Sequence, residues 1–334
     1  MTDGRSLVVV GGGITGLAAA WQAVQIAGTT VTVLEAEHRL GGRIATSDIA
    51  GLTVDEGPDS FLARVPWGLE LCQELDLTDE LVSPAARNAH VYSRGSLRPL
   101  PTSQVFGVPL DLDELASTGI GSPEGLAEAG TVIDRASAET TDDTIAAVMR
   151  RQVGTEIAER LVDPQIGGVN AGDTERLSLQ AVAPQLAAAA GHPDGLVAGL
   201  RQARTEHPPD PTAPVFHGLP GGTERLVTTL ADRLGGAGAT LRTAAPATGL
   251  ARSGGGGFEI TVGGPGRGTV LADRVVLATP APVTAALLDG LAPDPAEALR
   301  TIEHASVALL TLVVRRVDIG RPLDASGFLV PRVE

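Results

Sequence analysis

The sequence predicts an α/β fold, α+β overall, in which a dinucleotide-binding sheet is interrupted by a long inserted domain. Residues 5–35 read as strand, glycine-rich turn, Ala-rich helix and second strand. Strand patterns return over 240–285, and the region between them is mostly helical. The expected domains are 1–62 and 216–285 (the two parts of the cofactor domain), 63–215 (an inserted helical and substrate domain) and 286–334 (further substrate-domain strands).

Composition supports a packed core and excludes several functions. Hydrophobic residues make up 43% of the 334 residues and charged residues 19%, which rules out disorder throughout. The formal charge of -15 is opposite to that of a general nucleic-acid binder. All 25 basic residues are arginine, so a Schiff-base lysine and a lysine-containing phosphate loop are excluded. The single cysteine, Cys72, excludes an internal disulfide, and its apolar helical surroundings predict a core position.

No metal site or membrane span is expected. The six histidines lack the spacing of metal ligands. No run of 18 apolar residues exists, and residues 1–5 lack the features of a signal peptide. We therefore expect a cytoplasmic protein, with contact at the inner face of the cell membrane left open.

The first βα unit carries the strongest signal. Leu7–Val10 is a short apolar run typical of a buried parallel strand, and an Ala-rich helix follows the glycines. In a G-x-G-x-x-G turn, the first glycine permits the tight turn, the second lets a pyrophosphate approach the backbone, and the third lets the helix pack closely. The free N–H groups at the helix N-terminus attract phosphate. The expected cofactor-binding residues here are Gly11, Gly12, Gly13, Ile14, Thr15 and Gly16.

An acidic residue ends the second strand. Glu35 follows the run Val31–Leu34 and stands 19 residues after Gly16. A carboxylate at this place accepts hydrogen bonds from both ribose hydroxyls of an adenosine and disfavours a 2′-phosphate. We therefore expect Glu35, with the adjacent Ala36, to contact the cofactor, and we do not expect NADP.

A second motif follows at once. Residues 35–46 resemble the E-x-x-x-R-x-G-G-R-x-x-[ST] signature of the amine-oxidase-like flavoproteins, with Arg39, Gly42 and Arg43 in place. Arginine can donate a bidentate pair of hydrogen bonds to phosphate oxygens. The alternative is that Arg39 and Arg43 lie in a solvated surface loop without a ligand. In that family a segment like Gly57, Pro58, Asp59 and Ser60 runs beside the flavin ring, although by itself it is a plain turn. The resemblance implies a Rossmann-like FAD-binding domain of the amine-oxidase and glutathione-reductase type, with an inserted mixed substrate domain and a helical subdomain.

The remaining elements are expected from periodicity and turn residues. Residues 103–140 read as loops and helices, 192–214 as an exposed linker, and 254–257 as a hairpin turn. Expected helices are 66–77, 143–153, 156–162, 177–190 (interrupted at Pro184) and 224–234. Expected strands are 90–92, 97–101, 240–242, 258–262, 273–280 and a long one at 306–314.

The resemblance narrows to the oxygen-dependent protoporphyrinogen and coproporphyrinogen oxidases. Residues 161–173 with Leu177–Leu179 and 184–186 look most specific, because a turn there reaches the family's substrate cavity. The start of the helix at 219–226 and the segment 326–331 also resemble the family. Ala247 resembles the position whose backbone meets the adenine. The resemblance implies substrate contact at Gly168, Phe328 and Leu329.

The reaction implied is the FAD-dependent oxidation of a porphyrinogen to a porphyrin in haem biosynthesis, with oxygen as acceptor and hydrogen peroxide released. The flavin carries that chemistry, so the catalytic residues stay unassigned. Partners implied are the porphyrinogen, molecular oxygen and the next enzyme of the haem pathway. Coproporphyrinogen III is favoured as substrate, because the composition resembles Gram-positive family members and the strand 89–92 lacks the arginine of the mitochondrial branch. Protoporphyrinogen IX is the alternative.

The family extends more than a hundred residues beyond Glu334, and its last glycine-rich cofactor segment has no counterpart here. We therefore expect a truncated member whose chain retains FAD poorly. An amine oxidase or a carotenoid desaturase shares the N-terminal motifs but should lack the 167–178 pattern. A non-catalytic flavin- or haem-binding protein is a further alternative.

Overall fold

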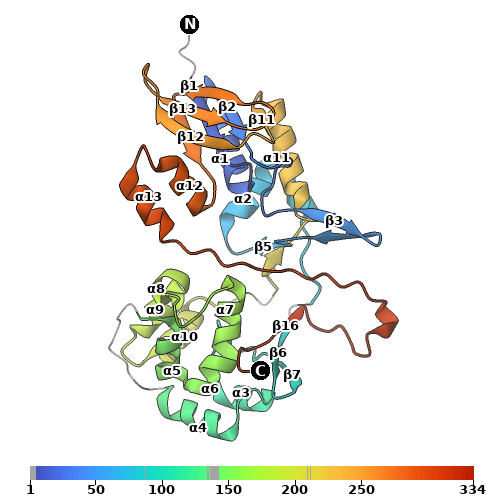
Figure 1. The fold of residues 1–334 in the computed structure, drawn as a ribbon. Helices are drawn as coiled ribbons and strands as arrows, with labels where there is room; N and C mark the ends of the chain where they lie inside the picture. The colour runs from blue at the N-terminus through green and yellow to red at the C-terminus, as the bar shows by residue number, and fades with distance from the viewer. Residues whose placement is uncertain (1–4, 87, 134, 136–142, 209, 211) are drawn as a thin grey trace. The chain divides into compact units, whose positions relative to one another are not determined.

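The computed structural model describes residues 5–86, 88–133, 135, 143–208, 210 and 212–334 (Figure 1). The chain divides into two compact units, each assembled from two separate stretches of sequence. The first unit comprises Met1–Pro84 and Pro214–Arg315, and the second comprises Ala85–Ala213 and Arg316–Glu334. The two expected parts of the cofactor domain, 1–62 and 216–285, therefore lie in one unit, together with 63–84 and 286–315.

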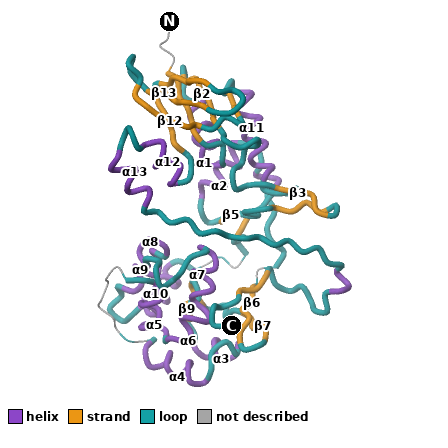
Figure 2. Tube along the Cα trace, viewed as in Figure 1, coloured by secondary structure: helices purple, strands orange, loops and turns teal. Residues whose placement is uncertain are grey.

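A four-stranded parallel sheet forms the centre of the first unit, in the order β11-β2-β1-β15. Figure 2 shows the strands of this unit in orange, with β2 labelled. Its strands are β1 (Arg5–Val10), β2 (Thr29–Leu34), β11 (Thr240–Arg242) and β15 (Arg274–Leu277). The chain runs outward from β1 through β2 to β11 and then returns to the other side of β1. This is the strand order of a dinucleotide-binding half, so the expected fold class is confirmed.

The two faces of this sheet are covered by different structures. Val9, at the centre of β1, packs with α1 (Ile14–Val24) and α11 (Glu224–Gly236). Its neighbours Val8 and Val10 face an antiparallel meander instead. The meander consists of β12 (Ala247–Arg252), β13 (Phe258–Val262) and β14 (Gly268–Ala272). All three valines are nearly fully buried, which explains why the strand reads as an unbroken apolar run.

The rest of the first unit surrounds this sandwich. The Cys72 side chain is 0% exposed on α2, which confirms its predicted core position. The turn predicted at 254–257 joins β12 to β13. The remaining elements are β3 (Thr46–Ile49), β4 (Leu52–Asp55), β5 (Phe61–Leu62), α2 (Pro66–Glu74), η1 (Thr78–Glu80), β10 (Phe216–His217), α12 (Ala281–Leu288) and α13 (Pro293–Arg300).

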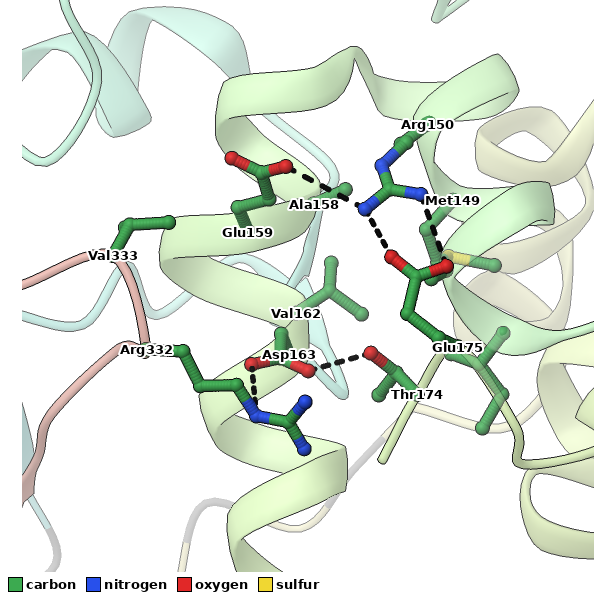
Figure 3. Close-up of a pocket in the computed structure, with 12 residues that line it drawn as sticks. Met149, Arg150, Ala158, Glu159, Val162, Asp163, Thr174, Glu175, Arg332 and Val333 are labelled. Carbon is green, nitrogen blue, oxygen red and sulfur yellow. Dashed lines mark hydrogen bonds and ion pairs between the residues drawn. The ribbon is translucent and has the colours of Figure 1, made fainter. Parts of the chain in front are cut away.

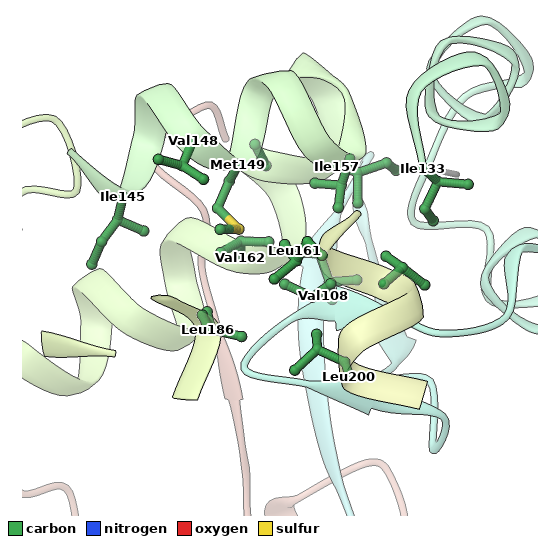
Figure 4. Packing of buried hydrophobic residues seen from close by; sticks show 14 of the residues in the cluster. Val108, Ile133, Ile145, Val148, Met149, Ile157, Leu161, Val162, Leu186 and Leu200 are labelled. Atoms are coloured by element: carbon green, nitrogen blue, oxygen red, sulfur yellow. The ribbon is translucent and has the colours of Figure 1, made fainter. Parts of the chain in front are cut away.

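The second unit is mainly helical, with a core of aliphatic side chains (Figure 4). Met149, Ile157 and Leu161 lie in that core and are fully buried. A π-helical turn, η2 (Ala158–Val162), separates two of its helices. The helices are α3 (Leu112–Thr118), α4 (Pro123–Val132), α5 (Ile145–Val153), α6 (Thr155–Ile157), α7 (Asp163–Asn170), α8 (Leu179–Val182), α9 (Pro184–Ala190) and α10 (Leu196–Glu206), with a 3-10 turn, η3 (Arg316–Asp318), later in the chain.

Two small sheets complete the second unit. One is the hairpin of β8 (Gln104–Val105) and β9 (Val108–Pro109). The other has the order β16-β6-β7, with β6 (Ala89–Ser93) antiparallel to β7 (Ser96–Pro99) and parallel to β16 (Gly327–Leu329). Val91 of β6 is fully buried against the helical core, and Leu329 packs on the same core.

Two expectations from the sequence are wrong. The predicted linker 192–214 contains α10, whose Leu196, Val197 and Leu200 are buried in the core, so its apolar spacing outweighed its prolines and charges. The predicted strand 306–314 is not a strand, and its Leu310 is 80% exposed. Residues with strand propensity form a strand only where a neighbouring strand can hydrogen-bond to them, and no described strand pairs with this stretch.

The expectation for residues 103–140 falls partly outside the described residues, because 134 and 136–140 are not described. The described part has the loops and helices expected, together with the β8–β9 hairpin.

Among the residues that the structure describes, no helix has the length and apolar character needed to cross a bilayer.

Candidate functional site

A cavity of about 1040 Å³ lies in the first unit, beyond the carboxyl ends of β1, β2 and β15. Gly11 follows β1, Glu35 follows β2 and Ala278 follows β15, and all three line the cavity. Connections from β1 and β15 lead away from this edge in opposite directions, so a crevice opens there. This is where open α/β sheets bind their ligands.

Two glycines permit the close packing at the floor of the cavity. Gly11 has φ +107°, and a Cβ added there would lie 2.6 Å from the carbonyl oxygen of Ala278. A Cβ on Gly16 would lie 1.8 Å from the carbonyl oxygen of Gly11. The tight turn predicted at Gly11 and the close helix packing predicted at Gly16 are therefore confirmed.

The N-terminus of α1 faces the cavity without a capping side chain. Gly13 is the N-cap residue, and the first turn of the helix has no acidic residue. Ile14 and Thr15, the first two helical residues, line the cavity. A Cβ on Gly13 would meet only the Cα of Gly42 within 4 Å, at 3.9 Å, so the space above it is open. Free N–H groups and the positive end of the helix dipole make this a position for an anion.

Glu35 fixes the glycine turn from the side. Its carboxylate is 8% exposed. One oxygen, Oε2, accepts from the N–H of Gly12 at 2.6 Å, and Oε1 accepts from the N–H of Glu37 at 2.8 Å. Each carboxylate oxygen can accept more than one hydrogen bond. Glu35 can therefore hold the glycine turn and receive a ribose hydroxyl together, and only the second task was expected from the sequence.

The two arginines of the second motif have different tasks. Arg39 does not line the cavity. Its guanidinium donates to the carbonyl oxygens of Gly42 at 2.7 Å, Ile44 at 2.8 Å and Leu40 at 3.2 Å. Arg39 therefore stabilises the loop. The sequence had predicted instead that its guanidinium would donate to a phosphate. Arg43 does line the cavity, where it is the one cation, and it makes no hydrogen bond or ion pair with another residue that the structure describes.

The second glycine loop lies directly against the first. The N–H of Gly41 donates to the carbonyl oxygen of Gly12 at 2.8 Å. A Cβ on Gly42 would lie 3.1 Å from the Cα of Gly13. Side chains larger than hydrogen would separate the two loops, so the double glycine places Arg43 beside the N-terminus of α1.

Asp55, a carboxylate that sequence reasoning missed, organises the side of the cavity that contains Pro58 and Thr223. Asp55 Oδ1 accepts from Thr46 Oγ1 at 2.7 Å and from Thr223, both from its N–H at 2.9 Å and from its hydroxyl at 3.0 Å. The Thr223 hydroxyl also lies 2.7 Å from the carbonyl oxygen of Pro58. Gly222, at φ +91°, gives these groups room. The available signal was the Gly-Gly-Thr segment before α11, together with an aspartate ending β4.

Most of the expected cofactor residues line this one cavity, and the others support it. Those lining it are Gly11, Gly13, Ile14, Thr15, Glu35, Ala36, Gly42, Arg43, Pro58, Ser60 and Ala247. Those outside the lining are Gly12, Gly16, Arg39, Gly57 and Asp59. A Cβ on Gly57 would lie 2.3 Å from the carbonyl oxygen of Arg43, which explains why that position is a glycine. Lining residues that the sequence did not single out include Phe61, Thr223, Pro246 and Thr279.

The three residues expected to contact substrate lie close together in the second unit. Gly168 was expected in a turn but stands in the last helical turn of α7, and the chain leaves the helix at Ala171, whose φ is +47°. A Cβ on Gly168 would meet Leu329 Cδ2 at 3.9 Å and nothing nearer. Phe328 points to the opposite face of β16 and is 56% exposed, whereas Leu329 packs inward.

The exposed face of the β16-β6-β7 sheet carries two aromatic side chains, the expected Phe328 and also Tyr92, which the sequence did not single out. Phe328 pairs with His90 of β6, so both point away from the helical core, as does Tyr92. Nearby Val169 and Val330 are also exposed. With aromatic residues at only 2% of the chain, their grouping on one face marks it as a candidate contact surface for an apolar ligand.

Comparison with known proteins agrees with this geometry. Residues 14–325 match the family described as flavin containing amine oxidoreductase. The coproporphyrinogen III oxidase of Propionibacterium freudenreichii is 33% identical, over 97% of this chain and 66% of the relative. Protoporphyrinogen oxidase 1 of the Spinacia oleracea chloroplast is 31% identical, over 91% of this chain and 55% of the relative. The chain thus spans about two thirds or less of the length of these curated relatives.

A solved structure extends the likeness to three dimensions. It comes from Exiguobacterium sp. 255-15 and is provisionally assigned as a protoporphyrinogen oxidase. The TM-score is 0.76 at 30% identity, with 88% of this chain and 63% of the other covered. The family match spans both units described above. The chain therefore belongs to the flavin containing amine oxidoreductase family.

Proposed function

We propose that the protein binds FAD in the first unit and oxidises a porphyrinogen to a porphyrin in haem biosynthesis, with coproporphyrinogen III as substrate. The observation that carries the proposal is the cavity at the carboxyl edge of the parallel sheet, where the N-terminus of α1, Glu35 and Arg43 converge. The names of the curated relatives support the choice of substrate class.

The residues present fit FAD. The uncapped N-terminus of α1 would take the pyrophosphate from one side and Arg43 from the other. Glu35 would accept from the adenosine ribose. Ala247, at the start of β12, also lines the cavity and would lie beside the adenine. Pro58 and Ser60, held in place by Thr223, would flank the flavin ring.

Bound FAD would supply the redox chemistry, taking hydride equivalents from the porphyrinogen in three rounds and passing the electrons to oxygen to give hydrogen peroxide. The protein's own groups bind, orient and shield. Within the first unit, the aliphatic side chains of Ile14, Ile44 and Leu226 line the cavity and would shield a bound cofactor from water. No side chain is proposed as a proton-transfer catalyst.

The substrate would contact the second unit. Gly168 and Leu329 would form one part of the proposed contact surface, with exposed Val169 beside them, and Phe328 would form another part with exposed Val330 on the opposite face of β16. A porphyrinogen is a large, partly apolar ring system, so an apolar surface with a bare glycine backbone suits its face. Coproporphyrinogen III is preferred over protoporphyrinogen IX, because the coproporphyrinogen III oxidases of Propionibacterium freudenreichii and Bacillus subtilis are 33% and 35% identical to this chain, against 31% for the chloroplast protoporphyrinogen oxidase.

The test compares both porphyrinogens, prepared without oxygen and mixed with the FAD-supplemented protein in air. Porphyrin fluorescence should rise faster with coproporphyrinogen III, and hydrogen peroxide should accumulate with it. Equal or faster turnover of protoporphyrinogen IX would reverse the substrate assignment. Turnover of an amine or a carotenoid precursor instead, or bound cofactor without peroxide, would contradict the proposal altogether.

A further inference from the structure

Arg332 joins two segments of the second unit that are far apart in the sequence (Figure 3). Its Nη1 donates to Asp173 Oδ1 at 2.8 Å, and its Nη2 donates to the carbonyl oxygen of Gly172 at 2.9 Å. Its Nε lies 3.8 Å from Asp163 Oδ2. One guanidinium therefore contacts both ends of α7: Asp163 begins the helix, and Gly172 and Asp173 follow its last turn.

The loop after α7 is arranged to receive this arginine. The N–H of Gly172 donates to the carbonyl oxygen of Gly167 at 2.9 Å, which turns the chain back on the helix. Thr174 Oγ1 donates to Asp163 Oδ1 at 2.5 Å, so the carboxylate is oriented toward Arg332 (Figure 3). A cation beside the carbonyl groups at a helix C-terminus is also favoured by the helix dipole.

The charged partners stabilise each other's ionised forms. The pKa of Arg332 is raised above its ordinary value, chiefly by its hydrogen bond to Asp173. The pKa of Asp173 is lowered by the N–H of Glu175 and then by Arg332. Hydrogen bonds between charged groups are stronger than neutral ones, although these groups are solvent-accessible and the gain is modest.

Arg332 follows a strand that needs such support. β16 has only three residues and pairs with β6 alone, in parallel. Before the strand, the N–H of Ser326 donates to the carbonyl oxygen of Asn88 at 2.8 Å. After it, Arg332 contacts α7 and the following loop, three residues beyond Leu329, which itself lies against Gly168. Glu334 fastens the same stretch elsewhere: it accepts from the N–H of Arg94 at 2.8 Å and pairs with Arg160. The strand is thus fastened at both ends, once to β6 and once to the helix that carries Gly168.

We propose that Arg332 is a positioning residue for the tetrapyrrole site: by holding the end of β16 against the C-terminus of α7, it fixes Leu329 beside Gly168 and, with it, the strand that presents Phe328 on its other face. The inference rests on the proposed function for the identity of the ligand. The clamp itself rests on the contacts given above. Arg332 contacts α7 and the loop after it. Its effect on the substrate would be indirect, through the position of β16 relative to α7.

The test uses the full chain with R332Q, which removes the charge and one of the two strong contacts. R321Q is the matched control, because Arg321 lies in the same segment and pairs only locally, with Asp324 at 3.7 Å. Coproporphyrin III is titrated by its fluorescence, and deuterium uptake is measured for the peptide containing Phe328 and Leu329. We expect R332Q to weaken coproporphyrin III binding by about fivefold, with faster deuterium uptake, and R321Q to match the wild type.

A charge exchange and a conservative change sharpen the result. The double variant R332D/D173R reverses the pair and should recover part of the affinity that each single variant loses. R332K keeps the charge but cannot reach both oxygens in the same geometry, so its affinity should fall between wild type and R332Q. A general loss of folding would instead lower the melting temperature and would not be relieved by the exchange.

The proposal is overturned if R332Q binds coproporphyrin III as the wild type does, or if affinity falls while deuterium uptake at β16 is unchanged. Failure of the proposed function is recognised separately, because the wild type itself then binds no coproporphyrin III. In that case the role in the tetrapyrrole site falls with it.

Discussion

The candidate sites of the two units differ in whether glycine backbone or side chains form their surface. In the first unit the part of the cavity beside the N-terminus of α1 is formed by glycine backbone, where Gly13 and Gly42 leave bare Cα atoms. In the second unit the candidate wall is formed by side chains on α7 and β16 and is held by charged groups at the surface. Backbone sites impose glycine at fixed spacing, so they can be identified from sequence, whereas side-chain sites leave no comparable pattern.

The largest effect is expected where backbone packing is closest. Gly16→Val would drive a side chain into the carbonyl of Gly11, 1.8 Å from the Cβ position, and should destabilise the first unit by about 3 kcal/mol or more. Thermal melting followed by circular dichroism checks this. Gly235→Ala is the control, because nothing lies within 4 Å of its Cβ position in α11. That change should be neutral or slightly stabilising, and equal melting of both variants would contradict the packing argument.

A smaller but still large effect is expected from the buried carboxylate of the first unit. Glu35→Gln turns an amide N–H₂ toward the N–H of Gly12 or Glu37, so one donor loses its acceptor. We expect adenosine diphosphate to bind about tenfold more weakly, as measured by calorimetry. Glu70→Gln, on the exposed side of α2, makes the same chemical change away from the cavity and should have no effect. Unchanged affinity in Glu35→Gln would remove Glu35 from the cofactor site.

The two arginines of the second glycine loop should separate stability from binding. Arg39→Gln removes donors from Gly42 and Ile44 and should lower the stability of the first unit by about 1 kcal/mol. Arg43→Gln should leave the melting temperature unchanged and weaken adenosine diphosphate binding by about fivefold, with a smaller salt dependence. If Arg39→Gln alone weakened binding, with no loss of stability, the roles assigned here would be reversed.

The smallest effect is a pH dependence confined to the second unit. Because the folded-state pKa of Asp173 lies below its ordinary value of about 3.9, its contribution to stability is present above that value. The contribution is lost as the pH falls through the folded pKa. The melting-temperature difference between wild type and D173N should therefore be constant from about pH 7 to about pH 5, begin to shrink near about pH 4 and disappear only when the pH lies below the folded-state pKa. A difference that persists in acid would contradict the ion pair with Arg332.

The sequence predicted the parts of the fold that depend on local pattern. The βαβ unit ending at Glu35 follows from apolar runs and glycine spacing, and the buried Cys72 follows from its neighbours. The cavity wall at Asp55 and Thr223 could not be predicted this way, because 168 residues separate the two partners. A hydrogen bond of that sequence separation depends on the tertiary fold.

The second unit shows the same limit more strongly. Gly168 was expected in a turn because residues 161–173 resemble the segment whose turn reaches the substrate cavity in the porphyrinogen oxidases, yet helix α7 continues through it. The prolines and charges of 192–214 led to the prediction of an exposed linker, although the segment contains α10 with a buried apolar face. For 306–314 the apolar pattern predicted a strand, but a strand exists only where another strand pairs with it. Arg332 gave no signal, because its partners come from α7 and the following loop.

The central claim is that the opening βαβ unit and its second glycine loop form a flavin nucleotide site. The most direct measurement is calorimetric titration of the chain with FAD, NADH and NADPH under one set of conditions. We predict that FAD binds about tenfold more tightly than NADH, even if its retention during purification is poor, and that NADPH binds least, because Glu35 repels a 2′-phosphate. Tighter binding of either nicotinamide nucleotide than of FAD would contradict the claim.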